Sequence, residues 1–252
     1  MSNFEKGFNV LRKNGFIVFF RKVRIFFLNR FRKKSEFHFV KDYKKFVKNL
    51  IKVYPIDEAM SLAVGGKYFE IGNIEKDILI RFGLKHNMSL IDYGCGSGRL
   101  ANALPIDLNI NYLGIDIIDE LLEYAKKKSP ENYRFIRHRK LSVPVESESV
   151  DMICAFSLFT HLLHEESYIY MEDMKRVLKI GGRLIFSFLE FGSVAHWSIF
   201  MATVDTQRNN TSPHLNTFIE QSVIKIWADK LGFKIIELES GQGQSLAVFE
   251  KI

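Results

Sequence analysis

The sequence predicts an α/β protein in which seven strands form a mostly parallel sheet with helices on both faces, preceded by a helical N-terminal extension. From Leu90 onward, short apolar runs alternate with segments of helical periodicity, and this alternation is typical of parallel sheets. The chain has 252 residues, of which 47% are hydrophobic and 26% charged. These values suit one sizeable globular domain with an appendage.

The elements can be placed in order along the chain. A helix is expected to begin near Arg99, and further helices are expected over 119–127, 165–178 and 219–231. The glycine pair at 181–182 stops the helix that precedes it. The last two strands form a hairpin through residues 240–244. The seven predicted strands are 89–93, 110–115, 133–137, 150–156, 183–188, 234–238 and 245–250.

Charge and composition divide the chain into three parts. Residues 1–50 form a basic arm that holds fourteen Lys and Arg, three acidic residues and eleven of the 23 phenylalanines, whereas the remainder is mildly acidic. Residues 51–88 read as a helical lid or cap, broken by two glycines at 65–66. Residues 89–252 form the main domain, with an insertion of little regular pattern over 191–217.

The arm has three competing interpretations. Its phenylalanines recur every three or four residues, so residues 1–34 can form an interfacial helix on an anionic membrane surface. Alternatively, the arm binds nucleic acid, since basic residues neutralise phosphates and aromatic rings stack on bases. A third interpretation is a helix that packs on the domain or on a second copy. The membrane is favoured over nucleic acid because base stacking needs fewer phenylalanines.

The most informative segment is the turn that follows the first predicted strand. Asp92 ends an apolar run, and glycines follow at positions 94, 96 and 98. Glycines permit positive φ and close approach of a ligand, which main-chain N–H groups and the helix start would hold. The spacing differs from that of a dinucleotide site, and Asp92 would repel a pyrophosphate. Asp116, at the end of the second strand, can accept both hydrogen bonds of a ribose diol. Ribose with a cationic amino-acid portion describes S-adenosylmethionine (SAM).

Asp92 to Gly98, followed by Gly114-Ile115-Asp116, resembles motif I and the acidic second-strand end of class I SAM-dependent methyltransferases. The resemblance spans about residues 68–251 and implies a Rossmann-like sheet of seven strands, the last antiparallel, with SAM as cofactor. It implies no metal. The acidic residue with which many members read adenine is replaced here by a basic stretch, so backbone groups near Leu141 and Ser142 are expected to read it. The predicted cofactor-binding residues are Asp92, Gly94, Cys95, Gly96, Gly98, Asp116, Ile117, Leu141 and Ser157.

Methyl transfer depends mainly on alignment, with a general base where the acceptor is a hydroxyl. Because ligands gather at the carboxyl ends of parallel strands, candidates should follow the fourth and fifth strands. His161 is the first choice for positioning the acceptor or removing its proton. Glu190 and His214 are candidates for binding a polar acceptor or acting as base. For each of the three, a capping, core or solvent-facing role remains the alternative.

The segments after the fourth and fifth strands look like those of bacterial small-molecule or glycan methyltransferases. The leading hypothesis is therefore O-methylation of a sugar, glycan or other small hydroxyl acceptor. One alternative is an RNA methyltransferase that uses the basic arm, and another is a SAM-binding module without catalysis. Two cysteines without a disulfide framework, no evident signal peptide and no apolar run of membrane-spanning length predict a cytoplasmic protein, peripheral at the inner membrane face. The oligomeric state is left open.

Overall fold

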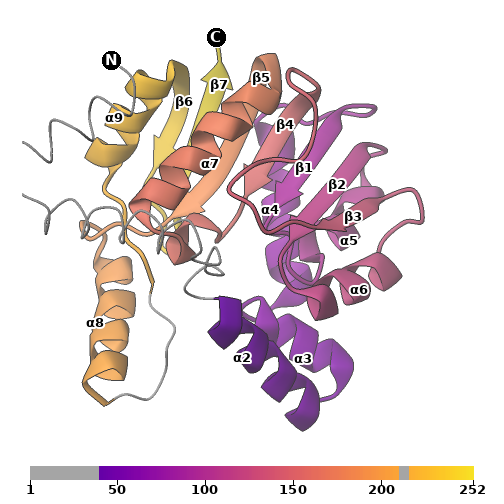
Figure 1. Ribbon diagram of the computed structural model, residues 1–252, viewed down its shortest axis with the longest axis vertical. Coiled ribbons are helices and arrows are strands. Elements are labelled where there is room, and N and C mark those ends of the chain that lie inside the picture. The colour runs from indigo at the N-terminus through magenta and orange to yellow at the C-terminus, as the bar shows by residue number, and fades with distance from the viewer. Residues whose placement is uncertain (1–39, 210–215) are drawn as a thin grey trace, which may run out of the picture. The chain divides into compact units, whose positions relative to one another are not determined.

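The computed structural model describes residues 40–209 and 216–252 (Figure 1). Most of the predicted basic arm, and with it the membrane segment 1–34, lies outside the described residues. His214 also lies outside them. The last part of the predicted arm forms helix α2 (Val40–Val53), which belongs to the compact unit of residues 39–252.

Seven strands form one mixed sheet in the order β3-β2-β1-β4-β5-β7-β6. Strands β1 to β5 pair in parallel, and β7 lies antiparallel between β5 and β6. This confirms the predicted Rossmann-like α/β class, including the hairpin at the end. The strands are β1 (Ser89–Tyr93), β2 (Asn111–Asp116), β3 (Arg134–Arg137), β4 (Val150–Ala155), β5 (Leu178–Phe188), β6 (Phe233–Glu239) and β7 (Ser245–Lys251).

Helices cover both faces of the sheet (Figure 1). On one face α4 (Tyr68–Arg81) packs on α5 (Arg99–Ala103), and on the other α7 (His164–Val177) packs on α9 (Gln221–Leu231). Alternate strand residues enter the core on the α4 side, where Leu79, Leu100, Met152 and Ile185 share one cluster. Helix α6 (Asp119–Lys128) follows β2 and contacts β3.

Two segments differ from the sequence prediction. Strand β5 begins at Leu178, five residues early, because the glycine pair continues the chain into the sheet instead of ending it in a turn. Gly181 has a φ of +75°, and the register with β4 shifts at that end of the strand. Residues 194–209 form helix α8 (Val194–Asn209), where little regular structure was expected. Only His196 of the helix is buried, so the helix needs no apolar face and its sequence shows no helical spacing of apolar residues. The periodicity signal was therefore missing.

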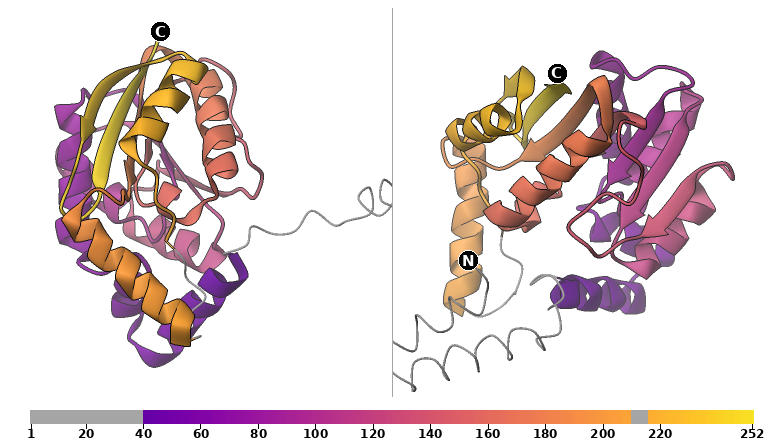
Figure 2. Two further views of the ribbon diagram at one scale, coloured as in Figure 1. Left: turned by 90° about the vertical axis from the view of Figure 1, so that its left-hand side faces the viewer. Right: turned by 45° about the horizontal axis from the view of Figure 1, so that its top comes forward.

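Helices α2 and α3 (Ile56–Ala63) lie at the end of the sheet where the parallel strands finish, and α8 extends from the same end (Figures 1 and 2). A cluster of Val47, Met60 and Ala63 packs on Ile118 and Leu121, at the start of α6. The cap therefore covers the carboxyl end of β2. Within the described part of the chain, none of the helices has the length and apolar character to cross a membrane.

Candidate functional site

The glycine-rich turn after β1 has the conformation that its sequence predicts. Gly94, Gly96 and Gly98 have φ values of +84°, +54° and +80°. The N–H groups of Gly94 and Cys95 both donate to the carbonyl of Ile115, at 2.7 and 3.1 Å, and Gly98 N–H donates to Cys95. These N–H groups are therefore already bonded within the protein, whereas the sequence predicted that they hold a ligand. The Gly94 carbonyl has no partner among the described residues, so the turn offers an acceptor for a cation.

The space beside two of these glycines is filled by the protein itself. A Cβ on Gly96 would lie 2.7 Å from Cγ1 of Val64, and a Cβ on Gly98 would lie 2.7 Å from Cβ of Ala125. Gly98 is thus needed for the packing of α5 against α6. At Gly96, the chain segment that approaches the turn is the end of α3, not open space for a ligand.

Asp116 ends β2 and is held by three main-chain donors. Its Oδ2 accepts from Gly96 N–H at 2.9 Å, and its Oδ1 accepts from Ile117 and Ile118 at 2.7 and 2.9 Å. Burial raises the pKa of this carboxyl, and the three N–H donors lower it. Oδ2 retains a free lone pair for a ribose hydroxyl, whereas a second hydroxyl would have to share Oδ1. The Ile117 side chain packs against the cap cluster.

Asp92 lies in the core beneath the turn rather than at its surface. Tyr112 donates to its Oδ2 at 2.7 Å, and the Cys154 thiol lies 3.7 Å from its Oδ1. Burial raises the pKa of Asp92 to about 7, the hydrogen bond from Tyr112 opposes the rise, and the nearby Glu75 charge adds to it. The predicted attraction of Asp92 for a cation therefore weakens below neutral pH.

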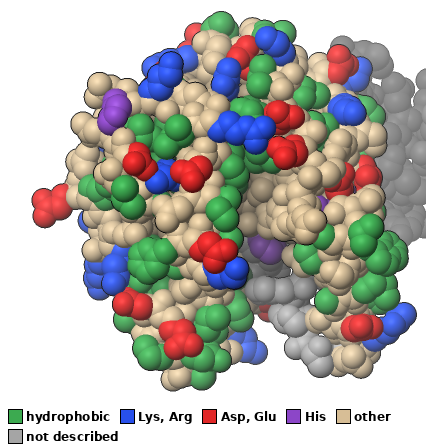
Figure 3. Space-filling model, turned by 180° about the vertical axis from the view of Figure 1, so that it is seen from behind, with side chains coloured by type: hydrophobic (Ala, Val, Ile, Leu, Met, Phe, Trp, Pro, Cys, Tyr) green, Lys and Arg blue, Asp and Glu red, His purple; other side chains and the backbone are tan. Residues whose placement is uncertain are grey.

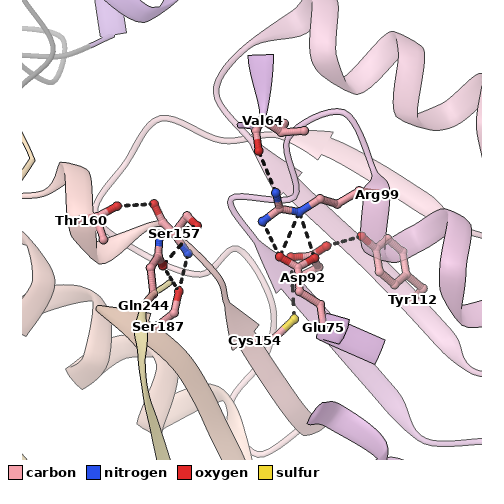
Figure 4. Close-up of polar contacts among 10 residues, drawn as sticks. All are labelled: Val64, Glu75, Asp92, Arg99, Tyr112, Cys154, Ser157, Thr160, Ser187 and Gln244. Atoms are coloured by element: carbon pink, nitrogen blue, oxygen red, sulfur yellow. Dashed lines mark hydrogen bonds and ion pairs between the residues drawn. The ribbon is translucent and has the colours of Figure 1, made fainter. Parts of the chain in front are cut away.

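A buried ion pair, which no sequence pattern predicts, joins the cap to the turn. The Arg99 guanidinium binds the Glu75 carboxylate through Nε and Nη2, and its Nη1 donates to the Val64 carbonyl at 2.7 Å (Figure 4). Burial raises the pKa of Glu75, and Arg99 opposes that rise. Glu75 and Lys76 are both buried charged residues of α4, and no local pattern pairs Glu75 with Arg99.

Further hydrogen bonds fasten the cap to the turn. The Ser97 hydroxyl donates to Met60 O at 2.9 Å, and the Tyr68 hydroxyl donates to Ser97 O at 3.0 Å. Tyr43, on α2, donates to Ala63 O at 2.9 Å. Burial, followed by the charge of Asp116, raises the pKa of Tyr43 well above its ordinary value. Helices α2, α3 and α4 therefore border the candidate cofactor site directly.

The loop after β3 offers one backbone group for adenine. Ser142 is already engaged, because its N–H donates to Lys140 O and its carbonyl accepts from the Tyr93 hydroxyl. The N–H of Leu141 has no acceptor among the described residues. Of the two positions named from the sequence, Leu141 is the one that the structure leaves available.

The candidates after β4 and β5 lie at the same end of the sheet. Ser157 lies two residues after the end of β4, and His161 ends the short helix η2 (Phe159–His161), where it is half-buried. Glu190 is buried, and its Oε1 accepts from the Ser245 hydroxyl at 2.5 Å. Ser187 and Gln244, which the sequence analysis did not single out, share hydrogen bonds with Ser157 (Figure 4). Serine and glutamine carry no sequence signal of their own.

The chain returns from the insertion across the ends of β4 and β5. Thr217 N–H donates to Thr160 O at 2.7 Å, and Ile219 N–H donates to Leu189 O at 2.7 Å. Seen from behind, the surface is hollowed between two projections, with a histidine side chain inside the hollow (Figure 3). In the described ranges, no group of three or more His, Cys, Asp or Glu is arranged to hold a metal ion.

Comparison with known proteins bears on this arrangement. Residues 91–186 match the family model described as "Methyltransferase domain". The chain is 26% identical over 159 residues to the ubiquinone biosynthesis O-methyltransferase of Colwellia psychrerythraea, covering 60% of this chain and 63% of that protein. It is 28% identical over 103 residues to an uncharacterized methyltransferase of Schizosaccharomyces pombe, covering 41% and 39% respectively. The chain thus spans less than two thirds of these relatives.

Solved structures agree in fold. The magnesium protoporphyrin IX methyltransferase of Synechocystis PCC 6803 with bound SAM superposes with a TM-score of 0.56 at 16% identity, covering 84% of this chain and 98% of that one. A SAM-dependent methyltransferase of Methanosarcina mazei gives 0.55 at 16% identity, covering 69% and 97%. At this identity the likeness concerns the fold alone.

Proposed function

We propose that this chain, whose residues 91–186 match the methyltransferase family model, uses SAM as its cofactor and methylates a hydroxyl oxygen of a small acceptor such as a sugar or glycan. When bound, SAM supplies a methyl group activated by its sulfonium. The described residues fit this cofactor: Gly94 O can accept from its ammonium group, Asp116 from its ribose and Leu141 N–H can donate to its adenine. Gly96 holds Asp116 through its N–H, and Gly98 allows α5 to pack against α6.

One observation supports the acceptor site more than any other. A Cβ on Gly94 would lie 3.3 Å from Cδ1 of Leu158, so the segment after β4 packs against the cofactor turn. That segment also carries His161, three residues on. We propose that His161 orients the acceptor hydroxyl and takes its proton as the oxygen is methylated. The relationship to an O-methyltransferase supports the same acceptor class.

A transfer assay with tritium-labelled SAM tests this proposal. Alkyl glycosides, catechol and an alkyl amine serve as acceptors, and the products are separated by chromatography. We expect label on a hydroxyl compound, and His161→Ala should lower kcat by roughly 10²–10⁴-fold if His161 is the base. Calorimetric affinity for S-adenosylhomocysteine should not change in that variant. Label on the amine alone would refute the hydroxyl acceptor, and an unchanged kcat would refute the base.

We further propose that the protein works at an anionic membrane surface. Fourteen basic residues in the first fifty would attract such a surface, and each contributes about 1 kcal/mol when close to it. Phe191, Val194 and Trp197 are exposed near the start of α8 and add apolar area that suits an interface. Flotation with phosphatidylserine vesicles, with and without residues 1–34, tests the arm. Equal partitioning of the two forms would refute it, and tight binding to RNA instead would favour the RNA alternative.

A further inference from the structure

Three polar side chains from distant parts of the chain meet at the ends of β4 and β5 (Figure 4). Ser157 follows β4, Ser187 lies near the end of β5, and Gln244 ends the loop of the β6–β7 hairpin. The Ser187 hydroxyl lies 2.5 Å from Oε1 of Gln244, and the Ser157 hydroxyl lies 3.0 Å from its Nε2. We refer to Ser157, Ser187 and Gln244 as the amide cluster.

The hydrogen bonds fix the orientation of the Gln244 amide. The Ser187 hydroxyl accepts from the N–H of Ser157 at 2.7 Å, so its own proton is free to donate to Oε1 of Gln244. Nε2 then donates to the Ser157 hydroxyl, which also lies 3.2 Å from Oε1 and can donate to it. An amide nitrogen carries two protons, and only one is used here. Among the described residues the second proton has no acceptor, so the cluster holds an unused donor.

The backbone at Ser157 is held in an unfavourable conformation. Its φ is +58°, in the left-handed region, which is unfavourable for a residue with a Cβ. Two contacts maintain it: Thr160 Oγ1 donates to Ser157 O at 2.8 Å, and the Ser157 N–H donates to Ser187. A glycine would adopt this conformation without strain. Strain of this kind is concentrated at binding and catalytic positions.

The amide cluster borders the cofactor turn. Leu158, the next residue after Ser157, is the one that packs against Gly94. Ligands in open α/β sheets bind outside the carboxyl ends of the strands, which is where Ser157 and Ser187 lie. The unused donor is therefore placed on the acceptor side of the site.

We propose that the amide cluster binds a neutral hydroxyl of the acceptor, adjacent to the oxygen that is methylated; this rests on the proposed function. The cluster consists of one amide and two hydroxyls, so it can donate to and accept from an uncharged oxygen without a charged partner. Ser245, next to Gln244, donates to the buried Glu190. A carboxylate so close disfavours phosphate or carboxylate groups at this position. The chemical class that fits is a polyol.

The test uses the full chain saturated with S-adenosylhomocysteine and three probes: methyl β-D-glucopyranoside, myo-inositol and glycerol. Binding is measured by ligand-observed NMR for the wild type and for Gln244→Ala and Gln244→Glu. Gln244→Glu keeps the shape and the acceptor for Ser187 but replaces the donor. Gln242→Ala, an exposed glutamine in the same hairpin loop, is the matched control. Thermal melting confirms that each variant is folded.

We expect the wild type and Gln242→Ala to bind at least one polyol alike, and both Gln244 variants to bind it roughly 10- to 100-fold more weakly, because a hydrogen-bond partner is lost. Cofactor affinity should stay the same in all four proteins. Equal polyol binding by Gln244→Ala and Gln242→Ala would overturn this inference and leave the proposed function standing. If the wild type binds none of the three polyols, the inference also fails, and the label-transfer assay decides the proposed function separately.

Discussion

Replacing Arg99 with Met should strongly destabilise the fold, because it breaks the buried ion pair beside the glycine turn. The Arg99 side chain is 14% exposed and its partner Glu75 is 7% exposed, so the pair is largely removed from solvent. Met preserves much of the apolar stem and removes the guanidinium. Glu75 is then left as a buried carboxylate with no cation beside it.

The expected cost follows from this burial. Exposed ion pairs contribute about 0–1 kcal/mol, whereas breaking a buried pair costs roughly 3–5 kcal/mol because an uncompensated charge remains. In a protein of this size, each kcal/mol corresponds to about 2–4 °C in Tm, so Arg99→Met should melt roughly 6–20 °C lower. The double variant Arg99→Met/Glu75→Gln removes both charges and should recover most of this loss.

The deficit should depend on pH in a defined direction. Burial already raises the pKa of Glu75, and loss of Arg99 removes the main influence that lowers it. A carboxyl whose folded-state pKa lies above its unfolded value binds a proton more tightly in the folded protein. The instability of Arg99→Met should therefore be greatest at pH 8, shrink as the pH falls through the raised folded pKa, and level off below the unfolded value.

Urea denaturation at pH 8 and pH 5, for the wild type, both single variants and the double variant, measures these quantities. The exposed pair Lys67–Glu70 supplies the control, since Lys67→Met should cost less than about 1 kcal/mol. A loss in Arg99→Met no larger than in Lys67→Met, or a double variant as unstable as the single one, would refute the reasoning.

Three further outcomes are expected. Asp116→Ala should weaken S-adenosylhomocysteine binding at least about tenfold by calorimetry while the protein stays folded, and unchanged affinity would remove the ribose role. Gly96→Val should displace the end of α3 and weaken cofactor binding, because its side chain clashes with Cγ1 of Val64. Adding Val64→Ala should partly restore both the position of α3 and the affinity for the cofactor. Absence of any rescue would show that the contact is unimportant. The raised pKa of Asp92 implies that its contribution to stability falls as pH rises from about 4 to 7, by roughly 4 kcal/mol at most, and Asp92→Asn should flatten that slope in urea titrations.

The half of the candidate site that would hold the methyl donor, formed by the glycine turn and Asp116, was largely predictable from the sequence. We refer to it as the donor half. The three alternating glycines and Asp116 carry strong local signals, because positive φ values and the end of a buried strand leave few alternatives. The structure places both where they were expected. What the sequence did not indicate was how these groups are already occupied. Gly96 donates to Asp116 and lies against Val64, a contact between residues 32 apart in the chain. Local patterns do not report such pairings.

The half that would hold the methyl acceptor, formed by the ends of β4 and β5 and the β6–β7 hairpin loop, was less predictable for a different reason. Its residues gain their meaning from tertiary position: Gln244 belongs to a hairpin loop 87 residues after Ser157, and no periodicity links them. Helix α8 was missed because few of its side chains are buried, so the apolar stripe that identifies helices is absent. Glu190 was named as a candidate for catalysis or acceptor binding. Its burial and its hydrogen bond from Ser245 show that it holds the hairpin loop, and its role toward an acceptor stays a prediction.

The two halves also differ in how they are held, and this bears on how they could change. The donor half is fixed by main-chain hydrogen bonds and by the Glu75–Arg99 pair, so a substitution that breaks this buried pair disturbs the fold. The amide cluster is fixed by three side-chain contacts from a loop and two strand ends. Substituting Gln244 alters the hydrogen-bonding pattern presented to an acceptor while leaving every strand pairing intact. A change of acceptor can therefore arise at this cluster with the sheet unchanged, whereas a change of cofactor at the turn has to preserve the main-chain hydrogen bonds that hold Asp116.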